Sequence, residues 1–293
     1  MKKSLPHIFT TPHYTAINRL NRLMRCVFAF GLILNLNSAF ASQKKFLVVI
    51  DPGHGGPDKG AIYRENGMVF AEKTLTLLIA RDLARELIIR GHNVILTRND
   101  DREVLLSDRT AIANKLKADA FLSIHLNSSL EKIKSGGVET FFLNHATDET
   151  SKRLADLENS VLKDSLANGN AGSNVSLITK DLILDGTRVP SKDLACSVQS
   201  HLISASRDRG VKQALFYVLL GADMPSILIE AGFMNSIGDR ARILKTKSRL
   251  ALAAHIASAI DDYQHQKKAK HCQVLSEKLF IRGEELQKVR KRI

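Results

Sequence analysis

The chain has 293 residues, 44% of them hydrophobic, which is enough to form one large core or two small ones. Its formal net charge of +13 suggests a nucleic-acid partner, but five positive charges lie in residues 1–25 and a net +6 lies in residues 264–293, which leaves +2 for the domain between. With no Trp and only 5% aromatic residues, the chain also lacks a base-stacking platform, so we expect no nucleic-acid partner.

Residues 1–41 have the pattern of a secretory signal peptide. Five basic residues and no acid precede the apolar stretch Cys26–Leu36, which has eleven residues and is too short to span a bilayer comfortably. Ala39 and Ala41 then supply small residues for a cleavage site. We therefore expect export and cleavage after about Ala41, with an uncleaved membrane anchor as the alternative.

Residues 45–263 carry alternating strand and helix signals that predict one α/β domain. Short apolar, β-branched runs predict strands at 46–50, 93–97, 120–124, 137–142, 216–219 and 226–230. Apolar residues at helical spacing predict helices at 72–90, 106–117, 191–206 and 247–263. Strands joined by crossover helices predict a mostly parallel, mixed central sheet that is covered by helices on both faces.

Residues 144–189 interrupt this alternation and predict a helical insertion. Residues 150–166 have helical spacing, 168–174 are rich in Gly, Asn and Ser, and 185–190 have the composition of a turn. An insertion of this length beside the active edge of a sheet is usually functional or disordered.

The tail, residues 264–293, is basic and has helical spacing. Its apolar residues fall on one stripe, with lysines and arginines elsewhere. Contact with an anionic surface and a solvated terminus are both open. Cys196 and Cys272 remain after export, and they could form one disulfide in an oxidising compartment or stay as two free thiols.

Two histidines and two glutamates are predicted to meet at one edge of the sheet. His54 lies in a Gly/Pro loop after the first strand, while His125 and Glu230 each end a later strand. Glu72 opens the helix that one loop connects to the first strand, so it returns to the same edge. In open α/β sheets, ligands bind outside the carboxyl ends of the strands.

This set of side chains favours a catalytic zinc site. Imidazole with carboxylate suits zinc, whereas magnesium and calcium prefer oxygen ligands only. We predict His54, Glu72 and His125 as zinc ligands, with a fourth position left for water, and Glu230 as the base that takes the proton of that water. Glu65 is an alternative to Glu72 from the same loop. Singly, each residue has a structural explanation; a carboxylate at position 72, for example, is favoured by the helix dipole.

Four motifs carry a resemblance to a known family: Asp51–Gly56, Glu72–Leu77, Ser123–Asn127 and Leu228–Asn235. They resemble the motifs of zinc-dependent N-acetylmuramoyl-L-alanine amidases, which cut the amide between the lactyl group of muramic acid and the L-alanine of the stem peptide. The resemblance extends over residues 45–263 and implies the same zinc ligands and the same catalytic glutamate. Two departures are a longer loop between the first histidine and glutamate, and Leu126 where a small residue is common.

The insertion resembles the regulatory region of division-associated amidases, in which a helix covers the zinc until an activator protein displaces it. Asp156, Glu158 and Asp164 are the acids that could reach the metal. We expect Glu158 to do so because Leu154, Leu157 and Val161 would pack its helix down; a solvated carboxylate is the alternative.

The resemblance implies a monomeric, periplasmic enzyme that acts on peptidoglycan in cell-wall remodelling or daughter-cell separation. Two other functions stay open. A zinc peptidase that cuts within the stem peptide would use the same metal chemistry on a different bond. A non-catalytic wall-binding protein with a degenerate site is disfavoured, because Glu72 and Glu230 are both present.

Overall fold

The computed structural model describes residues 45–128, 136–146, 148–160, 177–269 and 272. The signal peptide predicted for residues 1–41, the Gly-rich part of the insertion and nearly all of the basic tail after residue 269 lie outside this part of the chain. Export, cleavage and the role of the tail therefore stay predictions.

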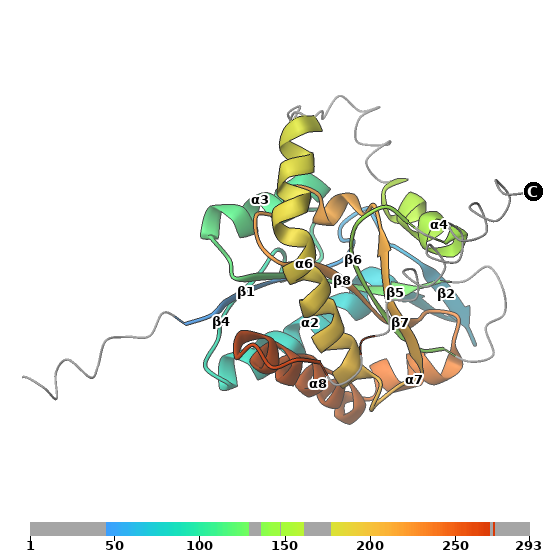
Figure 1. Cartoon of the computed structure of the whole chain (residues 1–293). Coiled ribbons are helices and arrows are strands. Elements are labelled where there is room, and N and C mark those ends of the chain that lie inside the picture. Colours follow the sequence, from blue (N-terminus) through green and yellow to red (C-terminus); the bar gives the residue numbers. More distant parts are fainter. Residues whose placement is uncertain (1–44, 129–135, 147, 161–176, 270–271, 273–293) are drawn as a thin grey trace, which may run out of the picture. The chain divides into compact units, whose positions relative to one another are not determined.

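Six strands form a mixed sheet in the order β4-β1-β5-β8-β6-β7 (Figure 1). Their bounds are β1 Leu47–Pro52, β4 Asn93–Leu96, β5 Ala120–Asn127, β6 Val138–Leu143, β7 Asp208–Ala214 and β8 Ser226–Phe233. All neighbouring strands pair in parallel except β6 and β8, which are antiparallel. The prediction of a mostly parallel, mixed sheet is confirmed.

Helices cover both faces of this sheet, so two hydrophobic clusters form. Val48 and Ile50 of β1 contribute to one cluster and Val49 to the other, as strand alternation requires. The first cluster contains residues of α2 (Glu72–Ile89), α6 (Leu177–Leu202), α7 (Ile237–Leu244) and α8 (Thr246–Gln264). The second contains residues of α3 (Leu106–Leu116), α4 (Glu149–Glu158) and the 3-10 helix η1 (Tyr217–Leu219).

The sequence predictions were wrong in the second half of the domain. The strand predicted at 216–219 is η1, and the strand that pairs with β6 lies earlier, at β7. Strand β7 is an edge strand with the sequence Asp-Arg-Gly-Val-Lys-Gln-Ala, so its pairing is set by position in the sheet and not by an apolar run. Helix α7 was not predicted, because its eight residues make too short a periodic signal.

Helix α6 also differs from prediction, because it begins at Leu177 and passes through the expected turn at 185–190. Pro190 lies inside the helix, four residues after Gly186. A helical proline clashes with the carbonyl four residues earlier and costs about 3 kcal/mol. The buried residues that follow it, including Leu194 and Val198, supply packing that outweighs this local preference.

A two-stranded hairpin of β2 (Ile62–Glu65) and β3 (Met68–Ala71) accounts for the longer loop between His54 and Glu72. Its turn is Asn66-Gly67, with φ of 49° and 77°. A type I′ hairpin turn needs positive φ at both of its central residues, which explains this Asn-Gly pair.

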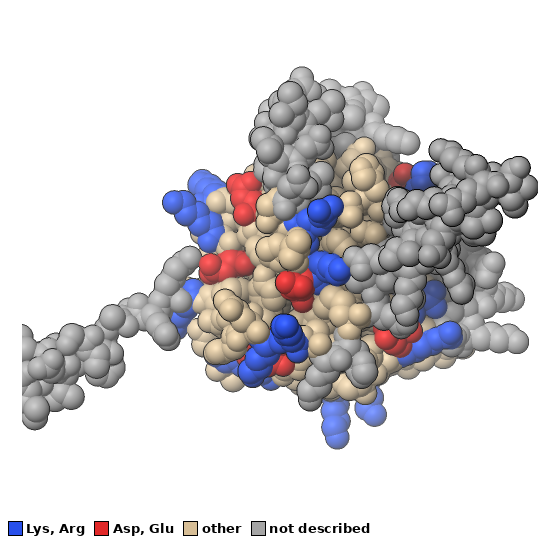
Figure 2. All heavy atoms as spheres, in the orientation of Figure 1, with Lys and Arg blue, Asp and Glu red and all other residues tan. Residues whose placement is uncertain are grey.

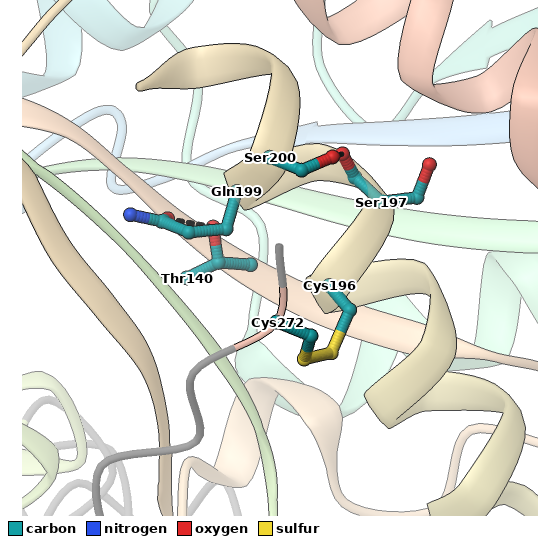
Figure 3. The surroundings of a disulfide bond; sticks show 6 residues. All are labelled: Thr140, Cys196, Ser197, Gln199, Ser200 and Cys272. Carbon is teal, nitrogen blue, oxygen red and sulfur yellow. Dashed lines mark hydrogen bonds between the residues drawn. A yellow bond between two sulfur atoms is a disulfide. The ribbon is translucent and has the colours of Figure 1, made fainter. Parts of the chain in front are cut away.

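A disulfide joins Cys196 of α6 to Cys272 (Figure 3), with their Cα atoms 5.0 Å apart. It ties the segment that follows α8 to the helix packed against α8. Of the two alternatives for these cysteines, the structure contains the disulfide.

Charges of both signs are interspersed over the described part of the face shown in Figure 2. Such mixing gives that face no continuous basic surface. Within the described ranges, we find no helix that combines the length and the apolar character needed to cross a membrane.

Candidate metal centre

The site lies where the carboxyl ends of β1, β5 and β8 meet. His125 near the end of β5 is in register with Glu230 of β8. His54 follows β1 in the Gly-rich loop, and Glu72 is the first residue of α2. The sheet therefore brings together the four side chains that the sequence analysis singled out.

Four ligand atoms from buried or half-buried side chains converge on one point. Glu72 Oε1 lies 3.0 Å from His54 Nε2 and 3.2 Å from His125 Nδ1. Glu158 Oε2 lies 3.2 Å from His125 Nδ1 and 3.5 Å from His54 Nε2. All four atoms are within 4.8 Å of one another, a spacing that could hold a metal ion.

Each of the two imidazoles has a buried ring nitrogen that could bind a metal. His54 Nε2 and His125 Nδ1 are buried and have no hydrogen-bond partner among the described residues. On the other side of its ring, His54 Nδ1 donates to Asp58 Oδ2 at 2.8 Å. A carboxylate that accepts from one ring nitrogen fixes the tautomer and leaves the other nitrogen's lone pair for a metal.

The Glu72 carboxylate is fixed by backbone groups. Oε2 accepts from the N–H of Ala61 and Oε1 from the N–H of Leu126, both at 2.9 Å. Two imidazoles with such a carboxylate suit a cation of zinc type better than a hard, oxygen-seeking cation. The residues present therefore fit a metal ligand set.

Glycines make room for these ligands. His54 itself has φ 62°, a left-handed conformation that L residues rarely adopt. A Cβ on Gly53 would lie 2.5 Å from the His125 ring, and one on Gly60 would lie 2.5 Å from His54 Cδ2 and 2.6 Å from Glu72 Oε2. The glycines of this loop therefore allow the side chains of His54, Glu72 and His125 to lie close together, in addition to forming the turn.

The charges of these side chains shift one another's pKa values. Burial works to lower the pKa of His54, but the charges of Glu72 and Glu158 outweigh it and raise that pKa to about 10. The pKa of His125 is also raised to about 10, against burial, by Glu158 and Glu72. Burial works to raise the pKa of Glu72, and the two imidazoles hold it far below its usual range.

Glu230 differs from the other acids because neither of its oxygens has a hydrogen-bond partner within the described residues. Burial, and then the charges of Glu72, Glu158 and Glu139, raise the pKa of Glu230 well above its usual value. A nearby cation would lower this pKa again. An unpaired, proton-accepting carboxylate beside a metal ligand set has the properties of a general base.

Glu139, a buried acid of β6 that is in register with Glu230, was not predicted. Its carboxylate accepts from Asn127 Nδ2 at 2.5 Å, from Lys212 Nζ at 2.6 Å and from Arg209 Nε at 3.4 Å. An acid inside an apolar strand was the available signal. Asp58 was missed as well, although an acid four residues after a loop histidine can be found by spacing.

Two candidate acids lie elsewhere. Glu65 pairs with Arg240 at 2.9 Å in the hairpin, so the structure places it outside the ligand group. Asp156 pairs with Lys152 at 3.0 Å on the exposed side of α4. Asp164 lies outside the described residues.

Helix α4 places Glu158 at the ligand group, but not with the packing that the sequence suggested. Leu154 and Ala155 are buried against the sheet, whereas Leu157 is 59% exposed and Val161 lies outside the described residues. The reason is helical geometry: the inward face lies between Leu154 and Ala155, Glu158 falls on the Ala155 side of Leu154, and Leu157 falls on its other side.

Asn159 joins the end of this helix to residues 215–217 of the same chain. Its Nδ2 donates to the carbonyl of Leu215 at 2.7 Å, and its Oδ1 accepts from the N–H of Tyr217 at 2.8 Å. We call this pair of bonds the Asn159 clamp. Because the clamp adjoins Glu158, it helps to hold that carboxylate at the ligand group.

An α/β fold with a His/Glu group that could hold a metal ion suits a metal-dependent hydrolase, and comparisons give the family. The family model for N-acetylmuramoyl-L-alanine amidase matches residues 48–262. The amidase AmiA of Escherichia coli (strain K12) is 31% identical over 233 residues, which are 76% of this chain and 78% of that protein.

Solved structures agree with this match. An N-acetylmuramoyl-L-alanine amidase from Clostridium difficile 630 has 32% identity and a TM-score of 0.59, with 77% of this chain and 100% of that chain covered. The amidase AmiC2 of Nostoc punctiforme has 29% identity and a TM-score of 0.56, with 76% and 99% covered. The chain belongs to the N-acetylmuramoyl-L-alanine amidase family, and its activity is hydrolysis of the amide between N-acetylmuramic acid and L-alanine in peptidoglycan.

Proposed function

We propose that this protein is an exported zinc amidase that remodels the cell wall during daughter-cell separation, and that α4 restrains it until an activator protein binds. The observation that carries the proposal is the convergence of His54 Nε2, His125 Nδ1 and Glu72 Oε1 beside the unpaired carboxylate of Glu230. Three protein ligands with one open position are the arrangement of catalytic zinc sites.

His54, Glu72 and His125 would hold the zinc. When bound, zinc supplies a Lewis acid that activates the attacking water and polarises the amide carbonyl. Glu230 accepts the proton of the water during attack. The same carboxyl group then donates that proton to the leaving nitrogen of L-alanine, so that the amine departs neutral.

The position of Glu158 supports restraint by α4. With this carboxylate added, four protein side chains would hold the zinc, as in metal sites of the closed, structural kind. Water and substrate then have no open position. A partner that binds better to the protein when α4 is displaced would shift the equilibrium towards the active state.

Export is supported by the basic and apolar leader and by the Cys196–Cys272 disulfide, because disulfides persist in oxidising compartments such as the periplasm. Purification of the protein from the periplasm and sequencing of its N-terminus tests this part. The expected start is near Ser42, and a chain that still begins at Met1 would contradict cleavage.

The activity is tested by mass spectrometry of muropeptides after digestion of cell wall with zinc-loaded enzyme, beside Glu230→Gln as control. We expect intact stem peptides with a free L-alanine amine from the wild type and at most about one hundredth of that product from the variant. Stem peptides cut internally would indicate a zinc peptidase, and binding without any product would indicate a non-catalytic wall-binding protein.

A further inference from the structure

Two buried arginines hold the backbone that carries His54. Arg109 of α3 donates from Nη1 to the carbonyl of Pro52 and from Nη2 to the carbonyl of His54, both at 3.0 Å. Arg98, which is fully buried, donates to the carbonyl of Pro52 at 2.9 Å and to that of Gly53 at 2.7 Å. The backbone carbonyls of three successive residues, the last of them His54, therefore accept hydrogen bonds from guanidinium groups.

Arg109 is itself fixed by a buried acid. Its Nη1 donates to Asp51 Oδ1 at 2.7 Å, and its Nε donates to the carbonyl of Val104 at 3.1 Å. Asp51 also accepts from Thr97 Oγ1 at 2.6 Å and from Ser123 Oγ at 2.8 Å. This network connects α3 and the strands β1 and β5 to the backbone of His54.

The backbone of His54 needs such support. A residue other than glycine with φ 62° pays a steric cost, and it keeps this conformation only when its surroundings enforce it. If the loop relaxed to an ordinary conformation, the imidazole would leave the point that it shares with Glu72 and His125. The Arg109 contact to the His54 carbonyl is the direct restraint on that change.

We propose that Arg109 is a positioning residue for the metal: it fixes the left-handed turn at His54, and metal affinity depends on this contact. The inference rests on the proposed role of His54 as a zinc ligand. Arg98 supports the same loop one and two residues earlier, so it acts on His54 less directly.

The test is zinc affinity of Arg109→Lys, measured by competition with a chromophoric chelator. Lysine keeps the positive charge beside Asp51, but a single ammonium group cannot reproduce the fork that reaches several carbonyls at once. We expect zinc to bind about 10- to 100-fold more weakly, the range seen when groups that orient metal ligands are changed.

Arg249 provides a matched control away from the site. It is also buried, and it donates to the acid Asp82 at 2.6 Å and to the carbonyl of Ile243 at 2.9 Å. Arg249→Lys should lower resistance to urea in the presence of chelator, as Arg109→Lys does. It should leave the zinc affinity and the absorption spectrum of the cobalt-substituted protein unchanged, whereas Arg109→Lys should alter both.

Two outcomes separate the failure of this inference from failure of the proposed function. Wild-type zinc affinity and an unaltered cobalt spectrum in folded Arg109→Lys, with metal lost in His54→Ala, would overturn the positioning role alone. Retention of zinc by His54→Ala would overturn the ligand assignment itself. If urea titration shows that Arg109→Lys does not fold, Arg98→Lys gives the same readout, with a measurable but smaller expected loss of zinc affinity, below about 10-fold; an unchanged zinc affinity there contradicts the inference.

Discussion

Two carboxylates reach the same point from regions of very different character. Glu72 lies at the buried start of α2, is 1% exposed and accepts hydrogen bonds from the N–H groups of Ala61 and Leu126. Glu158 ends the peripheral helix α4 and is 17% exposed at its side chain. Moving the first carboxylate would break both of these hydrogen bonds to buried backbone groups.

The second carboxylate depends on much less structure. Helix α4 is held by two buried apolar residues, Leu154 and Ala155, and by the Asn159 clamp. Breaking these contacts would leave the sheet and its ligands in place. One site thus combines a carboxylate fixed by the core of the domain, which we call permanent, with a carboxylate on a peripheral helix, which we call removable.

The largest effect is expected on the permanent side. His54→Ala and His125→Ala each remove one of two imidazoles from a buried ligand set, so we expect zinc affinity to fall by more than about 10²-fold and activity to become undetectable. Metal analysis after dialysis, with circular dichroism to confirm folding, checks this. Stoichiometric zinc in a His54→Ala/His125→Ala double variant would remove the assignment of the site.

Glu230→Gln should show the next largest effect. The amide keeps the size of the carboxylate but cannot accept the proton, so turnover should fall by about 10²- to 10⁴-fold while zinc content stays at the wild-type level. Turnover of a soluble muropeptide and metal content are measured on the same sample. Near-normal turnover would exclude Glu230 as the base.

On the removable side, Asn159→Ala should raise hydrolysis of cell wall in the absence of any partner. Two hydrogen bonds worth about 1 kcal/mol each are lost, which would raise the population of the open state by about 10- to 30-fold.

Asn114 gives a control with the same geometry. Its Nδ2 donates to the carbonyl of Gly221 at 2.7 Å, and its Oδ1 accepts from the N–H of Asp223 at 3.0 Å. Asn114→Ala should lower stability by a similar amount without raising basal hydrolysis. A rise of equal size in both variants would mean that general loosening, not release of α4, is responsible.

The smallest effect concerns pH in the metal-free protein. The pKa values of His54 and His125 are raised in the folded state to about 10, from an unfolded value near 6.5. Their contribution to stability is therefore complete below pH 6.5 and is lost as pH rises to 10.

Urea unfolding in chelator at pH 6, 8 and 10 measures this loss. Because Glu158 contributes to both raised pKa values, Glu158→Gln should flatten the decline. An equally steep decline in the variant would show that Glu158 does not reach the histidines in solution.

The permanent half of the site could be predicted from sequence. His54, His125 and Glu230 follow apolar runs, and the ends of parallel strands meet at one edge, so their proximity follows from topology. Glu72 could be placed because a single connection returns the chain to that edge. Local pattern and sheet geometry carry this information together.

The supporting contacts could not be predicted in the same way. Asn159 acts on the backbone of Leu215 and Tyr217, 56 and 58 residues away, and Arg109 on that of His54, 55 residues away. Every residue has a backbone carbonyl and every residue except proline an N–H, so the sequence does not show which of them take part in these hydrogen bonds. The covering helix was predicted through the family resemblance, and Glu158 was chosen within it from the apolar spacing of Leu154, Leu157 and Val161. The exposure of Leu157 shows that this spacing alone did not fix the rotation of the helix.

One pair of variants tests the account most directly: Glu72→Gln against Glu158→Gln, each measured for zinc content and for hydrolysis of isolated cell wall without a partner protein. We predict that Glu158→Gln keeps about one zinc per chain and hydrolyses faster than the wild type, while Glu72→Gln loses both zinc and activity. Loss of zinc from Glu158→Gln, or hydrolysis no faster than the wild type in a folded, zinc-loaded sample, would contradict the distinction between a permanent and a removable carboxylate.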